Sequence, residues 1–110
     1  MKARLSNHIN LPTDRFKEAE QFYERVLGLQ KGSENANYGH VTSGDRHLYF
    51  DSDTSTAGPI LEFVVADLEA AKRELIEAGC TILRWDGIGK PNYVKDPFGF
   101  VFNVFEEKEN

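Results

Sequence analysis

The hydrophobic pattern of this 110-residue chain switches between a period of two and a helical period, and the same order of segments occurs twice. In residues 5–11 apolar and polar side chains alternate, which indicates a half-buried β-strand. Thr13 and Asp14 are predicted to accept free N–H groups at the start of a helix that ends at Gly28. The apolar face of that amphipathic helix comprises Phe16, Ala19, Phe22, Tyr23, Val26 and Leu27.

Three shorter strands are predicted after this helix, at residues 29–31, 38–42 and 46–51, with a turn at 43–45. The second half begins again with a β-branched and aromatic strand, Ile60 to Val65. Asp67 is predicted to cap a second helix, which presents Leu68, Ala71, Leu75 and Ala78 on one face and ends at Gly79.

Three strands are predicted to follow the second helix as well, at residues 80–85, 92–95 and 100–105. Asp96-Pro97-Phe98-Gly99 matches the residue preferences of a type I turn. We therefore expect the α+β class, with two βαβββ modules that form a curved mixed sheet with a cup. Module one spans about residues 1–52, a polar linker about 52–58, and module two about 59–106, all in a single domain. Because a unit this short cannot bury its sheet alone, the modules must pack together or exchange across a dimer.

The faces of the strands can be assigned because successive side chains point to opposite sides. The face packed on a helix should be apolar, so we assign to it Leu5, Ile9, Leu11, Leu48, Phe50, Leu61, Phe63, Val65, Phe100, Phe102 and Val104. The opposite face then carries Ser6, His8, Asn10, His47, Tyr49, Asp51, Ile60, Glu62, Val64, Val101, Asn103 and Phe105. Polar groups among apolar walls are typical of a small-molecule pocket, although polar side chains on an open sheet can simply face solvent.

Composition and charge narrow the classes of partner. The net charge of -5 and the scattered basic residues argue against nucleic acid. Cys80 is the only cysteine, so an intrachain disulfide is excluded, and its strand-like setting favours a small buried side chain. No apolar stretch reaches the roughly 20 residues that span a bilayer, and no signal peptide is recognisable. We expect a cytoplasmic protein.

Three groups of residues resemble a known family. They are His8-Ile9-Asn10-Leu11 with Gln21-Phe22-Tyr23 and Val26-Leu27-Gly28-Leu29, then Val65-Ala66-Asp67-Leu68, then Asp96-Pro97-Phe98-Gly99 with the strand after it. In this order they resemble the vicinal oxygen chelate superfamily, which includes glyoxalases, bleomycin resistance proteins and extradiol dioxygenases. The resemblance covers nearly the whole chain. It implies a cup that is often completed in a homodimer, and in many members a divalent metal held by His or Glu.

The resemblance places the four metal-ligand positions on His8, Tyr49, Ile60 (Leu61 if the alignment slips by one) and Asn103. Only His8 is a standard ligand, because an aliphatic side chain cannot coordinate and amides and phenols bind transition ions poorly. We therefore expect neither a metal nor another cofactor. The alternative is a rearranged metal site, built from His8 and Glu62 with His47 or Asp51.

The candidate ligand-binding residues are His8, Asn10, Tyr49, Ile60, Glu62, Trp85, Tyr93, Asn103 and Phe105. His8 and Glu62 are also candidates for acid–base catalysis, since imidazole titrates near neutrality and burial raises a carboxyl pKa. Three of these residues have a structural alternative. His8 can be an ordinary strand residue, Glu62 can lie at an exposed rim of the sheet, and Trp85 can be a core aromatic.

Three functions follow from these residues. The first is binding of a small organic molecule without metal, as in bleomycin resistance proteins. The second is an enzyme of the lyase, isomerase or dioxygenase type, using a non-standard metal site or the His8 and Glu62 pair. The third is a structural module whose pocket is filled by its own side chains. Measurement of bound metal separates the metal-free binding protein from a metal-dependent enzyme.

Overall fold

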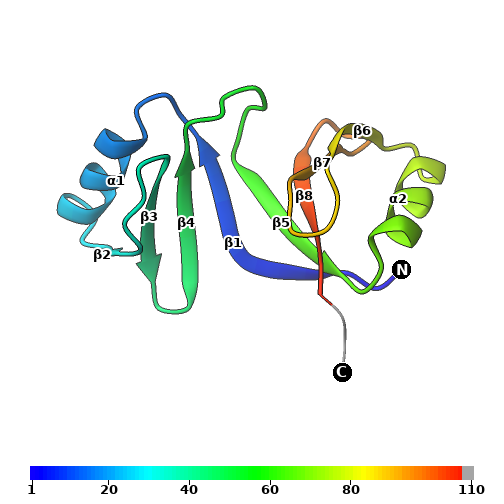
Figure 1. Cartoon of the computed structure of the whole chain (residues 1–110), viewed down its shortest axis with the longest axis horizontal. Helices are drawn as coiled ribbons and strands as arrows, with labels where there is room; N and C mark the ends of the chain where they lie inside the picture. The colour runs from blue at the N-terminus through cyan, green and yellow to red at the C-terminus, as the bar shows by residue number, and fades with distance from the viewer. Residues whose placement is uncertain (108–110) are drawn as a thin grey trace. The chain divides into compact units, whose positions relative to one another are not determined.

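The structure, a computed structural model, describes residues 1–107. Its first five elements are β1 (Arg4–Pro12), α1 (Phe16–Arg25), β2 (Gln30–Lys31), β3 (Tyr38–Ser43) and β4 (Arg46–Asp51). The same order then repeats in β5 (Ile60–Val65), α2 (Leu68–Glu77), β6 (Thr81–Trp85), β7 (Asn92–Lys95) and β8 (Val101–Glu106) (Figure 1). The expected α+β fold of two βαβββ modules is confirmed. Within residues 1–107, neither helix is long and apolar enough to cross a membrane.

The chain divides into two compact units. The first unit comprises Asn7–Ile60, and the second comprises Met1–Ser6 together with the chain from Leu61 onwards. The sequence pattern grouped the first six residues with the first module instead. They belong to the second unit because their polar groups bond there: Ser6 Oγ donates to Glu62 Oε2 over 2.6 Å, and the N-terminal amine pairs with Glu74 over 2.8 Å.

The first unit contains a mixed sheet with the strand order β2-β3-β4-β1. β1 runs parallel to β4, whereas β3 pairs antiparallel with both β2 and β4. Helix α1 contacts β3 and β4, and the ring of Tyr23 lies 4.9 Å from that of Phe50. Phe50 therefore faces the helix, as the alternation along its strand predicts.

The prediction for α1 was wrong in two respects. The helix begins at Phe16, because Thr13 Oγ1 accepts the N–H of Arg15 in the turn before it, and no side chain caps the helix. Its buried residue is Glu20, while Phe22, Val26 and Leu27 are exposed. The reason is tertiary: α1 packs mainly on β3, and the missing side chain of Gly39 leaves room there for the Glu20 carboxylate. Glu20 Oε2 accepts the His40 backbone N–H over 2.8 Å.

The second unit contains a mixed sheet with the strand order β5-β8-β7-β6, in which β5 runs parallel to β8. Asp67 caps α2 as expected, with its side chain accepting the N–H of Ala70 over 3.0 Å. The buried core lies between α2 and this sheet and consists of Val65, Leu68, Ala71, Val94 and Val104. The predicted turn is confirmed as well: Gly99 N–H donates to the Asp96 carbonyl, and the Asp96 side chain accepts N–H groups of Phe98 and Phe100.

Candidate functional site

The polar face of the first unit brings together several of the predicted site residues. His8 is in register with His47, and Asn10 with Tyr49, so these four side chains share one face of the sheet. The His8 ring lies 4.9 Å from the His47 ring and 5.2 Å from the Tyr49 ring. Asn10 Nδ2 donates to Asp51 Oδ2 over 3.4 Å. The strands thus gather imidazole, phenol and amide groups as expected.

His40 completes this cluster, although sequence reasoning did not select it. It is in register with Tyr49, and the two rings stack with centroids 4.4 Å apart and planes 7° apart. Its Nε2 lies 2.9 Å from Nδ1 of His47. Alternation along 38–42 could have placed His40 on the face of Tyr49, once the pairing of β3 with β4 was known.

Burial lowers the pKa of His40 below its ordinary value of 6.5. The neighbouring imidazoles of His47 and His8 lower the pKa further, because a second positive charge beside either is unfavourable. The Glu20 carboxylate acts in the opposite direction and does not reverse the shift. His40 is therefore neutral at physiological pH, as an imidazole with 7% exposure should be.

We expect acidification to destabilise the protein through His40. Above its unfolded pKa of about 6.5, both folded and unfolded chains hold a neutral imidazole. Below it, the unfolded chain takes up a proton that folded His40 binds less readily, so the free energy of unfolding falls until the lower folded pKa is passed. Urea unfolding at about pH 7.5 and about pH 5.5 measures this loss.

A matched variant attributes the loss to this residue. Asparagine in His40→Asn keeps an oxygen near the position of Nδ1 but has no group that titrates in this range. The loss on acidification should be smaller in the variant than in the wild type. An equal loss in both proteins would contradict the assignment.

The polar face of the second unit carries Glu62 and Asn103, which are in register on β5 and β8. Asn103 Nδ2 donates to Glu62 Oε1 over 3.1 Å, and the other carboxylate oxygen accepts the Ser6 hydroxyl. Asn103 Oδ1 accepts the backbone N–H of Asn92 over 2.8 Å. Both polar atoms of the Asn103 amide are thus used within the protein, and Ser6 and Asn103 each bond one oxygen of the Glu62 carboxylate.

Of the remaining predicted site residues on this sheet, Tyr93 and Phe105 lie on the face of Asn103, and Trp85 does not. Tyr93 is buried and in register with Asn103, whereas Trp85 packs against the core under α2, with Lys72 Nζ 5.4 Å from its ring centroid. Phe105 is half-buried on β8. The structural alternative for Trp85, a core aromatic, therefore describes its surroundings better than a stacking platform.

The family's metal positions do not fit a divalent ion. Tyr49 accompanies His8 in the first unit, Ile60 is aliphatic and 1% exposed, and both polar atoms of the Asn103 amide are already bonded. Across residues 1–107, no group of three or more His, Cys, Asp or Glu side chains could hold a metal ion.

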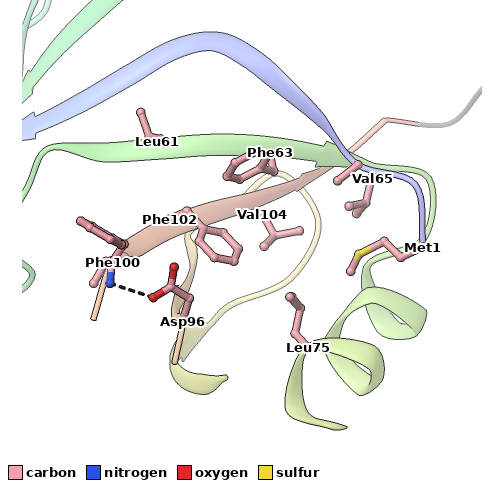
Figure 2. A pocket seen from close by; sticks show the side chains of 11 residues that line it. Met1, Leu61, Phe63, Val65, Leu75, Asp96, Phe100, Phe102 and Val104 are labelled. Carbon is pink, nitrogen blue, oxygen red and sulfur yellow. Dashed lines mark hydrogen bonds between the residues drawn. The ribbon is translucent and has the colours of Figure 1, made fainter. Parts of the chain in front are cut away.

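A pocket of about 400 Å³ lies in the second unit, on the helix side of β5 and β8 (Figure 2). Its walls are apolar, with Asp96 as its one acidic residue, and comprise Met1, Ala3, Leu61, Phe63, Val65, Leu75, Asp96, Phe100, Val101, Phe102 and Val104. The rings of Phe63 and Phe102 meet edge to face with centroids 5.2 Å apart. The pocket thus opens on the opposite face of the strands from Glu62 and Asn103.

Sequence reasoning assigned Leu61, Phe63, Phe102 and Val104 to the helix side but did not expect a pocket there. The signal was the composition of α2, whose inward face alternates leucine with alanine. Small side chains on a ten-residue helix leave part of an apolar strand face uncovered.

Comparison with known proteins identifies the family. Residues 5–104 match the family model of the Glyoxalase/Bleomycin resistance protein/Dioxygenase superfamily, while a search of curated proteins finds no match. A superfamily member from Vibrio splendidus has 15% sequence identity and a TM-score of 0.66, covering 96% of this chain and 98% of that chain. Methylmalonyl-CoA epimerase from Mycobacterium tuberculosis has 19% identity and a TM-score of 0.62, covering 96% and 88%.

A variant of homoprotocatechuate 2,3-dioxygenase from B. fuscum has 24% identity and a TM-score of 0.66, covering 98% of this chain but 33% of that chain. At these identities the solved structures establish the fold alone. The family model covers most of the chain, in agreement with the repeated βαβββ order. The chain belongs to the Glyoxalase/Bleomycin resistance protein/Dioxygenase superfamily.

Proposed function

We propose that this protein binds a small, mainly apolar organic molecule in the pocket of its second unit, without a divalent metal. The pocket itself carries the proposal: a volume of about 400 Å³ lies within the roughly 300–1,000 Å³ common for ligand sites. Three phenylalanines line it, so an uncharged aromatic or aliphatic group fits its chemistry best. The Asp96 carboxylate is engaged by two backbone N–H groups and serves the turn.

The donor chemistry supports the metal-free part of the proposal. Ile60 and Asn103 stand where the resemblance predicts family ligands. The Ile60 side chain cannot coordinate, and both polar atoms of the Asn103 amide are already hydrogen-bonded, so neither position supplies a coordinating group. Acid–base catalysis by Glu62 is less well supported, because both of its oxygens accept hydrogen bonds from Ser6 and Asn103. Homodimer formation and cytoplasmic location stay predictions.

Thermal unfolding with indole as the probe tests the pocket. At about ten times its dissociation constant, a bound ligand stabilises by about 1.4 kcal/mol, which raises Tm by several degrees. Leu61→Lys places an ammonium group at the pocket wall and should abolish this increase. Leu83→Lys is the matched control, because Leu83 is similarly exposed, 46% against 40% for Leu61, and lies outside the pocket.

Equal stabilisation of wild type and Leu61→Lys would refute the pocket as the binding site. The metal is tested separately, by elemental analysis of protein purified without chelators. We expect far less than one ion per chain. Stoichiometric zinc, nickel, iron or manganese would overturn the metal-free part of the proposal. It would not affect ligand binding in the pocket, which the thermal unfolding experiment tests.

A further inference from the structure

The three histidines of the chain all lie in the first unit, on three different strands. The rings of His40 and His47 stack with centroids 5.1 Å apart, and His8 lies beside His47 on the next strand. Tyr49 contacts all three rings. This cluster is separate from the apolar pocket, which is lined by residues of the second unit.

The hydrogen bonds of His40 determine its tautomer. Its Nδ1 lies 2.9 Å from the backbone nitrogen of Ser33 and 3.0 Å from the Ser33 hydroxyl. A backbone N–H can only donate, so Nδ1 of His40 must be an unprotonated acceptor. Neutral His40 therefore carries its proton on Nε2.

The tautomer of His47 follows from that of His40. The Nε2–H of His40 donates over 2.9 Å to Nδ1 of His47, which must also be an unprotonated acceptor. Neutral His47 then carries its own proton on Nε2. A neutral histidine normally exchanges between two tautomers. In His47 the bonds that run from the Ser33 backbone through His40 select one of them, in which Nε2 is the donor.

This donor is available for binding. Within residues 1–107, Nε2 of His47 has no hydrogen-bond partner, and this atom is not fully buried. It therefore reaches solvent, on the face where His8 and Tyr49 lie. The titratable groups packed on the cluster are His8 from β1, Tyr38 from β3, Tyr49 from β4 and Glu20 from α1. The Glu20 carboxylate accepts the backbone N–H of His40.

We propose that Nε2–H of His47, fixed by the bond from His40, is the hydrogen-bond donor of a second ligand site, which recognises a carbonyl or carboxylate oxygen of a small organic molecule. A donor held in place before binding lowers the ordering cost of that contact. In this tautomer both ring nitrogens of His47 are committed, Nδ1 as the acceptor from His40 and Nε2 as a donor, so the site discriminates against ligands that present only donors. The proposal does not depend on the apolar pocket.

Nitrogen-15 NMR of the histidine side chains tests the first half of the inference. At about pH 7.5, both His40 and His47 should show a protonated Nε2 and an unprotonated Nδ1. Ser33→Ala should leave both tautomers unchanged, because the backbone N–H remains. A protonated Nδ1 on His47, or an averaged signal from two tautomers, would overturn the inference.

Three probes with the same ring test the recognition half: benzoate, benzamide and benzylamine. Benzoate and benzamide carry an acceptor oxygen and should shift the His47 Nε2–H resonance saturably, whereas benzylamine should not. His47→Asn retains an amide oxygen near Nδ1 but no donor at Nε2, and should bind benzoate about tenfold more weakly. His47→Gln places an amide nitrogen near Nε2 and should recover part of the affinity.

The outcomes distinguish this site from the proposed pocket. Leu61→Lys should leave benzoate binding at His47 unchanged. No response to either acceptor probe, or equal binding by the wild type and a folded His47→Asn protein, would reject the second site. If His47→Asn does not fold, the benzylamine comparison and His47→Gln still decide the question.

Discussion

Asn92→Ala is expected to lower the free energy of unfolding by about 3–5 kcal/mol. Asn92 is 1% exposed, and its side chain bonds to four backbone groups. Oδ1 accepts the Gly87 N–H, while Nδ2 donates to the carbonyls of Gly87, Lys90 and Val104 over 2.9–3.1 Å. Alanine leaves these groups without a partner and opens a cavity, so several desolvation penalties add. Urea unfolding at neutral pH measures the change.

Two further variants separate hydrogen bonding from volume. Asn92→Asp preserves the size but cannot donate to three carbonyls, and should destabilise at least as much as alanine. Asn35→Ala removes one exposed bond, from the Asn37 N–H, and should cost less than about 1 kcal/mol. If Asn92→Asp were as stable as the wild type, the donors of Asn92 would not be what holds this loop.

Gly32→Ala is expected to destabilise by about 2–3 kcal/mol. A Cβ atom at position 32 would overlap Nδ1, Cγ and Cε1 of the His40 ring. That ring cannot move away freely, because it stacks on Tyr49 and accepts the N–H of Ser33. The substitution should therefore displace His40 and break its bond to His47, with a loss of stability measurable by urea unfolding.

A double-mutant cycle identifies the origin of this effect. In a His40→Ala background the ring is absent, so Gly32→Ala should cost much less than in the wild type. The nitrogen-15 spectrum of Gly32→Ala should also show His47 with two exchanging tautomers. Additive effects of the two substitutions would mean that the cost of Gly32→Ala does not arise from His40.

Much of the architecture could be predicted from local pattern. Strands β4, β5 and β7 have the predicted bounds, and the Asp67 cap and the turn at Asp96 form as expected. These features depend on neighbours within a few residues, where backbone geometry and side-chain capping act. The faces of Tyr49 and Phe50 also followed from alternation alone.

The prediction for α1 shows that the local sequence pattern does not determine which face of a helix is buried. Helical spacing marked Phe22 and Val26 as inward-facing, yet they are exposed and Glu20 is buried. The face of a helix that turns inward depends on the residues packed opposite it. Here Gly39 on β3 leaves space for the Glu20 side chain, and the His40 N–H donates a hydrogen bond to its carboxylate. Neither contact is visible in a window of sequence around the helix.

The sequence by itself determined two βαβββ modules and the family to which they belong. The metal positions, of which only His8 is a standard ligand, stay a prediction from the resemblance. The tertiary structure decided which side chains meet. Ser33, His40 and His47 come from a loop and two strands, and their protons are fixed only because strand pairing brings them within hydrogen-bond distance. The apolar pocket likewise exists because α2 covers part of a strand face. Alternation is a property of each strand, whereas coverage and contact are properties of the packed chain.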